Sequence, residues 1–270
     1  MVDLIANNLR FYVEETGEGP AVLLLHGFPD TGEVWRLQVP ALAGSGFRVV
    51  VPDLRGRGRS ERPEPVEAYA LTELVADVIG ILDALEIDRA HVVGHDWGAA
   101  LAWAVASLAP ERVDRLVVMS VGFPGAIRPD QRALEKGWYR LLFLFPEAED
   151  VLYSDDAYLL RMLVAGAPDE DRYLTALQDR GALSAGLAWY RANLPVQTLP
   201  GADTPSLLPV AAPTLGLFGE NESFLSEAAM LASERYVTGG WRYERIAGAG
   251  HGLQLEQPER LNELLLDFLA

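Results

Sequence analysis

Short hydrophobic runs alternate with longer amphipathic segments over about the first 120 residues of the chain. The short runs are rich in valine and leucine, as expected for strands that are buried on both faces of a sheet. The segments between them predict helices over residues 71–85, with apolar positions at helical spacing, and 99–108, rich in small residues. Strand, helix and strand in succession predict an α/β fold with a mostly parallel central sheet flanked by helices. The predicted strands are residues 21–25, 48–51, 91–93 and 116–119.

This alternation stops after Phe123. From there to about Leu208 the pattern is mostly helical, with aromatic and acidic residues and no clear strand. An all-helical insertion between strands is typical of a cap, and ligands of open α/β sheets bind beyond the carboxyl ends of the strands. We therefore expect a core domain made of residues 1–123 and 209–270, with residues 124–208 as a helical lid over the site. A helical decoration without a catalytic role is the alternative.

Strand and helix patterns return at Pro213 with an apolar run. We expect a helix at residues 226–236, a strand at residues 241–246 and a final helix from Glu256. At the other end of the chain, residues 1–15 alternate polar and apolar side chains. They lack the charged and apolar parts of a signal peptide, so we expect a strand there and a cytoplasmic protein.

Composition and charge narrow the classes of function. The chain has 270 residues, no cysteine and a formal net charge of −17. The missing cysteine excludes disulfides, thiolate catalysis and cysteine-ligated zinc. The negative charge argues against a nucleic-acid or anionic-membrane partner, and no window approaches the roughly 18 apolar residues of a membrane span. We expect an enzyme that needs no cofactor or metal and is monomeric or homodimeric.

The strongest chemical signal is the segment Gly94-His95-Asp96-Trp97-Gly98, which follows an apolar run and precedes a helix pattern. It has the spacing of a nucleophile elbow, with aspartate at the central position. The glycines allow a tight turn that raises Asp96 above the sheet at a helix N-terminus. A carboxylate attacks an alkyl carbon without the help of a base, and the attack forms an ester. An ordinary helix N-cap is the alternative for Asp96.

An ester on Asp96 must be cleared by water, which requires a general base. His251 is the candidate, because it lies in a glycine-rich loop after the last predicted strand, where the nucleophile–acid–histidine order places the base. The acid that orients the imidazole is expected in the loop after the apolar run at residues 214–218. That loop offers Glu222 and, as its competitor, Glu220.

The oxyanion that forms during ester hydrolysis needs backbone N–H groups as hydrogen-bond donors. Residues 26–30, with the sequence HGFPD, directly follow a predicted strand. The N–H groups of Phe28 and of Trp97, the residue after the nucleophile, are the natural pair. A second glycine-rich loop at residues 53–60 lacks the lysine and the spacing of a phosphate-binding loop. We interpret this second loop as a structural support for the elbow.

With these motifs assembled, the chain resembles the soluble epoxide hydrolases of the α/β-hydrolase superfamily. The segments HGFPD, DLRGRGRS, GHDWGA and GAGHGLQLEQPERL occur in the right order over the whole length. The resemblance implies that a small apolar epoxide and water are the reactants and that the Phe28–Pro29 bond is cis. The family usually has aspartate at the acid position, whereas this chain has Glu222.

The same resemblance implies two cap tyrosines whose hydroxyls hydrogen-bond the epoxide oxygen. Tyr139, in the segment WYR, and Tyr190, in the segment WYRAN, occupy the matching places. An alkoxide leaving group needs such a donor, whereas packing between lid and core is the alternative role of each ring. The residues expected to contact the substrate in an apolar pocket are Phe28, Trp97, Trp138 and Trp189.

Haloalkane dehalogenases are near relatives that would use the same Asp96 and His251. Trp97 matches one of their usual halide donors, but the asparagine that commonly follows HG is replaced by Phe28. Fluoroacetate dehalogenases carry arginines around the nucleophile, where this chain has Trp97 and Ala100. Both departures favour an epoxide hydrolase. A hydrolase-fold protein that keeps the motifs but only binds a ligand is the third hypothesis.

Overall fold

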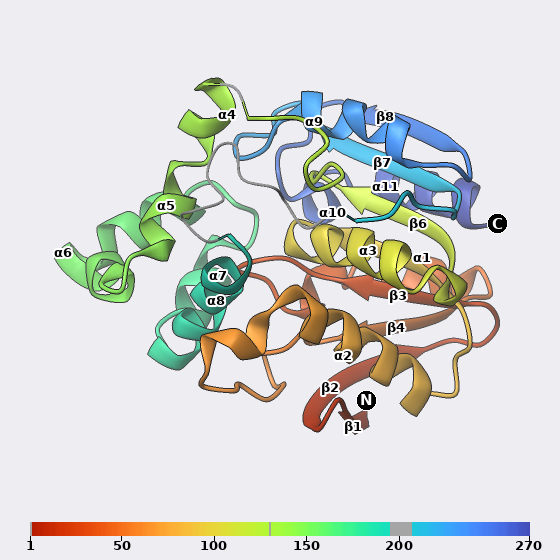
Figure 1. The fold of residues 1–270 in the computed structure, drawn as a ribbon, viewed down its shortest axis with the longest axis horizontal. Coiled ribbons are helices and arrows are strands. Elements are labelled where there is room, and N and C mark those ends of the chain that lie inside the picture. The colour runs from red at the N-terminus through yellow and green to blue at the C-terminus, as the bar shows by residue number, and fades with distance from the viewer. Residues whose placement is uncertain (1, 130, 195–206) are drawn as a thin grey trace.

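The central feature of the computed structural model, which describes residues 2–129, 131–194 and 207–270, is a single sheet. Within those ranges its order is β1-β2-β4-β3-β5-β6-β7-β8 (Figure 1). Neighbours from β4 to β8 run parallel, whereas β2 pairs antiparallel with both β1 and β4. The predicted α/β fold with a mostly parallel sheet is therefore confirmed. The strands are β1 (Val2–Ala6), β2 (Leu9–Thr16), β3 (Ala21–Leu25), β4 (Arg48–Pro52), β5 (Ala90–His95), β6 (Val113–Met119), β7 (Thr214–Gly219) and β8 (Trp241–Ile246).

The N-terminal segment forms a hairpin instead of the single strand that we expected. Asn7 and Asn8 join its two strands with positive φ angles of 44° and 62°. Asparagine tolerates this left-handed backbone, and two such residues in succession form the tight turn that suits a hairpin. The pair of asparagines between two alternating runs was therefore the overlooked signal.

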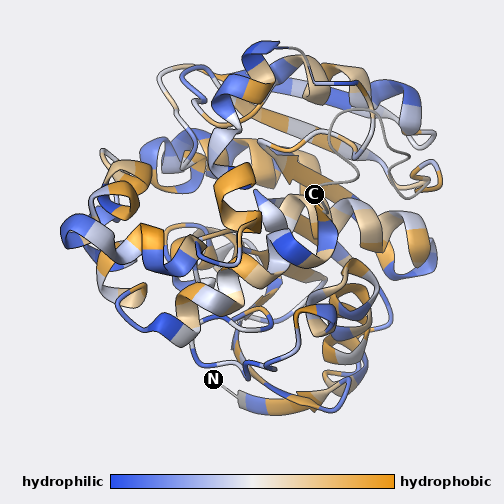
Figure 2. Cartoon of the chain, turned by 60° about the vertical axis from the view of Figure 1, so that its left-hand side comes forward, coloured by the Kyte–Doolittle hydropathy of each residue, from blue (hydrophilic) through white to orange (hydrophobic). Residues whose placement is uncertain are grey.

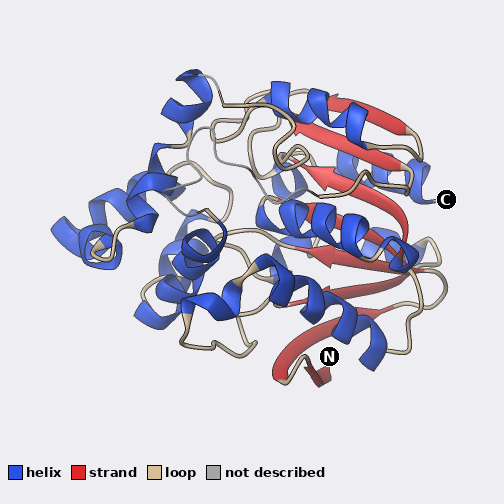
Figure 3. Ribbon diagram, in the orientation of Figure 1, coloured by secondary structure: helices blue, strands red, loops and turns tan. Residues whose placement is uncertain are grey.

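The sheet separates two hydrophobic layers, because successive residues of a strand point to opposite faces. In β3, Leu23 and Leu25 pack into the layer of α2 and α3, whereas Val22 and Leu24 pack into the layer of α1 and α11. Figure 3 shows helices on both sides of the sheet, and Figure 2 shows hydrophobic residues along its strands. The core helices are α1 (Val39–Gly44), α2 (Leu71–Ala84), α3 (Trp97–Leu108), α9 (Glu227–Leu231), α10 (Leu253–Glu256) and α11 (Pro258–Leu269), and the 3-10 helices are η1 (Gly32–Trp35), η2 (Val66–Tyr69), η3 (Pro110–Arg112) and η5 (Ala232–Tyr236).

Two predicted helices near the C-terminus are each divided in the structure. The helix expected at residues 226–236 consists of α9 followed by η5. The final helix, expected from Glu256, consists of the short α10 and then α11, which begins at Pro258. Proline disfavours helical backbone in the residue before it, and Gln257 accordingly has φ −137° and ψ 57°.

The helices between β6 and β7 gather beside one end of the sheet, toward the left in Figure 1. Within α6, the backbone at Ser154–Ala157 is not helical. The predicted cap, residues 124–208, includes residues 130 and 195–206, which lie outside the described part of the chain. Among the described helices, none is long and apolar enough to cross a membrane. The helices of this region are α4 (Gln131–Lys136), α5 (Trp138–Leu144), α6 (Ala148–Val164), α7 (Glu170–Ala176) and α8 (Arg180–Asn193).

Candidate active site

Asp96 occupies the sharp turn between β5 and α3, with φ 52° and ψ −120°. A positive φ is strained for a residue with a side chain, so the surrounding structure must hold it. The flanking glycines are required by close packing. A Cβ on Gly94 would lie 2.2 Å from the Gly98 oxygen, and a Cβ on Gly98 would lie 2.1 Å from the Leu25 oxygen. The sequence pattern G-x-D-x-G thus corresponds to a backbone that admits no larger residue at either glycine.

Two backbone N–H groups hold the Asp96 carboxylate in place. The N–H of Phe28 donates to Asp96 Oδ1 at 2.9 Å, and the N–H of Trp97 donates to the same carboxylate. Burial raises the pKa of Asp96, while the nearby His251 and these two N–H groups oppose that rise. The pair that we expected to stabilise an oxyanion therefore already contacts the carboxylate from which that oxyanion would form.

His251 lies between two carboxylates. Its Nδ1 is 2.7 Å from Glu222 Oε2, and its Nε2 is 3.8 Å from Asp96 Oδ2. Burial alone would lower the pKa of His251, but the contact with Glu222 and the charge of Asp96 together raise it to about 9. Burial would likewise raise the pKa of Glu222, and the charge and hydrogen bond of His251 lower it to about 2 instead.

The structure distinguishes the two acids that the sequence left open. Glu222 is buried against His251, and its Oε1 accepts the N–H of Phe224 at 2.8 Å. Glu220 is exposed and accepts the N–H of Gly248 at 3.0 Å. Of the two side chains, only that of Glu222 contacts the imidazole.

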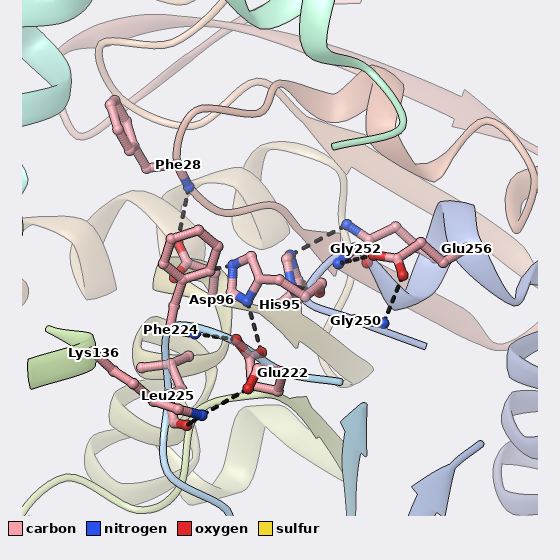
Figure 4. A network of polar contacts seen from close by, with 12 residues as sticks. Phe28, His95, Asp96, Lys136, Glu222, Phe224, Leu225, Gly250, Gly252 and Glu256 are labelled. Carbon is pink, nitrogen blue, oxygen red and sulfur yellow. Dashed lines mark hydrogen bonds and ion pairs between the residues drawn. The ribbon is translucent and has the colours of Figure 1, made fainter. Parts of the chain in front are cut away.

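Polar contacts fix the loop that carries His251. The His95 Nε2 lies 2.8 Å from the His251 carbonyl oxygen, and Glu256 accepts the N–H groups of Gly250 and Gly252 at 2.6 and 2.9 Å. The chain's single lysine, Lys136, donates from α4 to the carbonyl oxygens of Glu222 and Leu225, as Figure 4 shows. These contacts tie the loop of His251 to the elbow, and the loop of Glu222 to helix α4.

A cavity of about 340 Å³ lies between the elbow and the helices of the predicted cap. Both Tyr139 and Tyr190 line it together with Asp96 and His251. Their rings lie edge to face at 6.3 Å, and burial and the charge of Asp96 raise the pKa of both hydroxyls. Both phenols are therefore fully protonated at neutral pH. The apolar part of the lining is Phe28, Pro29, Phe143, Leu160, Leu163, Val164, Ala165, Ala167, Pro168, Leu177 and Phe224.

Comparison with known proteins agrees with this geometry. A family model described as alpha/beta hydrolase fold matches residues 20–258. The chain belongs to the α/β-hydrolase family. Within it, Epoxide hydrolase A of Mycobacterium tuberculosis is 34% identical over 98% of this chain and 95% of its own length. The AB hydrolase superfamily protein YfhM of Bacillus subtilis is 31% identical over 97% and 95%.

Solved structures of epoxide hydrolases are also similar to this hydrolase. A Bacillus megaterium epoxide hydrolase in complex with an inhibitor has a TM-score of 0.88 and 26% identity, with 99% of each chain covered. Epoxide Hydrolase A of Mycobacterium thermoresistibile has a TM-score of 0.80 and 30% identity, covering 99% of this chain and 97% of its own. The expected resemblance to epoxide hydrolases is confirmed, and the Phe28–Pro29 bond is cis as that resemblance implied.

Three tryptophans that we expected at the substrate lie outside the hydrolase's cavity lining. Trp138 is 40% exposed, because adjacent residues of a helix point about 100° apart and Tyr139 takes the inward direction. Trp189 is buried, and its indole N–H donates to the Arg55 carbonyl oxygen. The Trp97 ring lies edge to face with that of Tyr190 at 5.0 Å.

The hydrolase also brings to the cavity two residues that the sequence analysis did not select. Asp30 lines the cavity together with Tyr173 of α7, whose hydroxyl hydrogen-bonds the carboxylate. Burial raises the pKa of Asp30 to about 7. The place of Asp30 in the segment HGFPD, two residues after Phe28, was a usable signal. No sequence pattern marks Tyr173, because it lies among polar residues of a helical segment.

Proposed function

We propose that the protein is an epoxide hydrolase that opens an epoxide to a vicinal diol through an ester on Asp96. The observation that carries this proposal is that two protonated phenols, Tyr139 and Tyr190, line the same cavity as Asp96 and the His251–Glu222 pair. Relatives that match the chain over its whole length bear the name epoxide hydrolase, which supports the same reaction.

In the first step, Asp96 Oδ2 attacks a carbon of the epoxide. This oxygen is the natural nucleophile, because Oδ1 already accepts the N–H of Phe28. The new bond joins Oδ2 to carbon, the ring C–O bond breaks, and the ring oxygen takes a proton from one of the two tyrosine hydroxyls. Hydrogen bonds aimed at the oxygen that gains charge lower the barrier to ring opening.

In the second step, His251 removes a proton from water, and the resulting hydroxide attacks Cγ of Asp96. The oxyanion then forms on Oδ1, where the N–H groups of Phe28 and Trp97 already point. When it collapses, the Cγ–Oδ2 bond breaks and the departing diol oxygen takes the proton of the new carboxylic acid, which restores the Asp96 carboxylate. The proton held by His251 returns, through solvent, to the tyrosinate that ring opening left. Ester formation neutralises Asp96 and so removes one of the charges that raise the pKa of His251. The imidazole thus becomes easier to use as a base at the stage where a base is needed.

A dehalogenase would have less use for this arrangement. A halide leaves as a weakly basic anion and needs no proton, so two phenols beside the nucleophile would have no chemical purpose. The Phe28 position, where haloalkane dehalogenases commonly have an asparagine donor, holds an apolar ring against Tyr190 at 5.8 Å. A protein that only binds a ligand would not need a base contacting both carboxylates.

The decisive experiment traps the ester. In His251→Gln, styrene oxide should form an adduct of one substrate mass on Asp96, detected by mass spectrometry of the intact protein and of its peptides. A single turnover of the wild-type enzyme in heavy-oxygen water should label Asp96 and leave the first diol unlabelled. His251→Gln/Asp96→Asn is the control and should form no adduct. Diol formation without label in Asp96 would contradict covalent catalysis.

The tyrosines supply a second test. On the His251→Gln background, which isolates ring opening, Tyr190→Phe and Tyr139→Phe should each slow ester formation by about tenfold or more, and the double variant should be nearly inactive. Tyr158→Phe, on an exposed part of α6, is the matched control and should leave the rate unchanged. If ring opening proceeds at the wild-type rate in the double variant while haloalkanes release halide, the epoxide assignment is wrong.

A further inference from the structure

Arg57, in the glycine-rich loop after β4, is an unpaired charge in the interior. The residue is only 5% exposed, yet among the described residues its guanidinium has no carboxylate partner and no hydrogen-bond acceptor. Its neighbours in the loop differ. Arg55 is equally buried but forms two hydrogen bonds to Asp77, at 2.7 and 2.5 Å, and Arg59 lies largely in solvent. Burying an unpaired charge is costly, so Arg57 requires an explanation.

The contacts of Arg57 lead toward the active site. Its guanidinium carbon lies 4.6 Å from the centre of the Phe28 ring, a cation–π geometry. Its Nη1 packs so closely on α8 that a Cβ on Gly186 would lie 2.7 Å from it. Burial lowers the pKa of Arg57 to about 10, so the side chain stays protonated at neutral pH.

Gly186 precedes Tyr190 by four residues in α8, and residues with this spacing lie on the same face of a helix. The Arg57 charge therefore lies about one helical turn from the tyrosine that lines the cavity. Phe28 provides a second connection between Arg57 and the site. Its ring, which lies under the guanidinium, packs on Tyr190, and its N–H donates to Asp96. The guanidinium thus touches the Phe28 ring and α8, which both contact or carry Tyr190, whereas Asp96 is reached only by the backbone N–H of Phe28.

We propose that Arg57 is a positioning residue for ring opening, whose buried charge acts through Phe28 and Tyr190 to stabilise the oxygen that leaves the ring. Ring opening moves negative charge from Asp96 to the epoxide oxygen beside Tyr190. A cation packed against the ring and the helix that hold Tyr190 favours charge at the second place, and so stabilises the transition state relative to the ground state. This inference rests on the proposed function.

The test replaces the charge and keeps the length of the side chain. On the His251→Gln background, Arg57→Met should slow ester formation from styrene oxide by about tenfold or more. The epoxide concentration for half-maximal rate should not change, because the uncharged substrate gains no binding from Arg57. The melting temperature should not fall, since an apolar side chain replaces an unpaired buried charge. Arg57→Lys, which keeps the charge but loses the planar stack, should retain most of the rate.

Arg55→Met is the matched control in the same loop. It leaves Asp77 buried without its partner, so it should lower the melting temperature while ester formation by the folded protein stays within about threefold of the parent. Ester formation at the parent rate in Arg57→Met would overturn the proposal. Equal losses of rate and melting temperature in Arg57→Met and Arg57→Lys would also overturn it, because they indicate packing alone. If the parent His251→Gln forms no ester with styrene oxide, the proposed function itself fails.

Discussion

Residue 96 is an aspartate, where many hydrolases of this fold have a serine. This difference changes the chemical roles expected of the residues around it. In the mechanism that we propose, Asp96 needs no activation, so His251 is free to serve the second step. The two N–H groups that a serine enzyme would aim at the substrate carbonyl here donate to the Asp96 carboxylate. On this proposal, the hydrolytic step acts on an ester of the protein itself.

The acid provides the prediction at this scale. Glu222→Gln should slow ester hydrolysis by about 10²-fold or more, because the imidazole loses the carboxylate that orients it and stabilises its charged form. Ester formation should change much less, so the Asp96 ester should accumulate in the steady state. Rapid-quench mass spectrometry measures both steps. Glu220→Gln, two residues away and exposed, should leave both unchanged, and the reverse pattern would assign the acid to Glu220.

At the scale of an element, the unit that matters is β5, the elbow and α3. Its glycines allow backbone segments to pack closely, since a Cβ on Gly98 would lie 2.1 Å from the Leu25 carbonyl oxygen. We predict that Gly98→Ala destabilises the fold by about 3 kcal/mol, because the atoms it would strike are backbone and cannot rotate away. Gly44→Ala is the control, because a Cβ there meets nothing within 4 Å. Urea denaturation compares the two, and equal midpoints would contradict this packing account.

At the scale of the whole molecule, the chain has a formal net charge of −17, and acidic side chains also line the cavity. The described residues that line it include Asp96, Glu256 and Asp30, whose pKa of about 7 leaves it partly ionised at neutral pH. They include no lysine or arginine, and the positive charge of His251 is offset by its partner Glu222. Two like charges about 8 Å apart repel by roughly 2 kcal/mol at an effective dielectric constant of about 20. Epoxides that carry an anion should therefore be poor substrates, whereas neutral ones of the same shape should be good.

A matched pair of substrates tests this prediction. The amide 4-(oxiran-2-yl)benzamide should exceed 4-(oxiran-2-yl)benzoate in kcat/KM by about tenfold or more, after each value is divided by the rate of uncatalysed hydrolysis. Glu256→Gln should narrow the ratio, and the amide serves as the internal control for any loss of catalysis. Equal values for the two compounds in the wild-type enzyme would show that the cavity does not select by charge.

Much of this protein was determined by local sequence. The parallel sheet, the helical insertion, the elbow and the position of His251 each follow from a pattern within a few residues, such as alternation, helical spacing or paired glycines. Such patterns are readable because strands, helices and tight turns restrict which residues fit. The N-terminal hairpin belongs here too, since Asn7 and Asn8 carried a turn signal that could have been read.

Only the tertiary structure decided the rest. Whether Glu222 or Glu220 contacts His251 depends on where two loops almost thirty residues apart meet, and nothing within either loop expresses that. Tyr139 lines the cavity while its neighbour Trp138 faces solvent, because the docking of α5 chooses one helix face, and aromatic residues lie on both. The unpaired charge of Arg57 is likewise invisible in the sequence. Contacts between distant segments set burial and partners, and a linear pattern records only the neighbours along the chain.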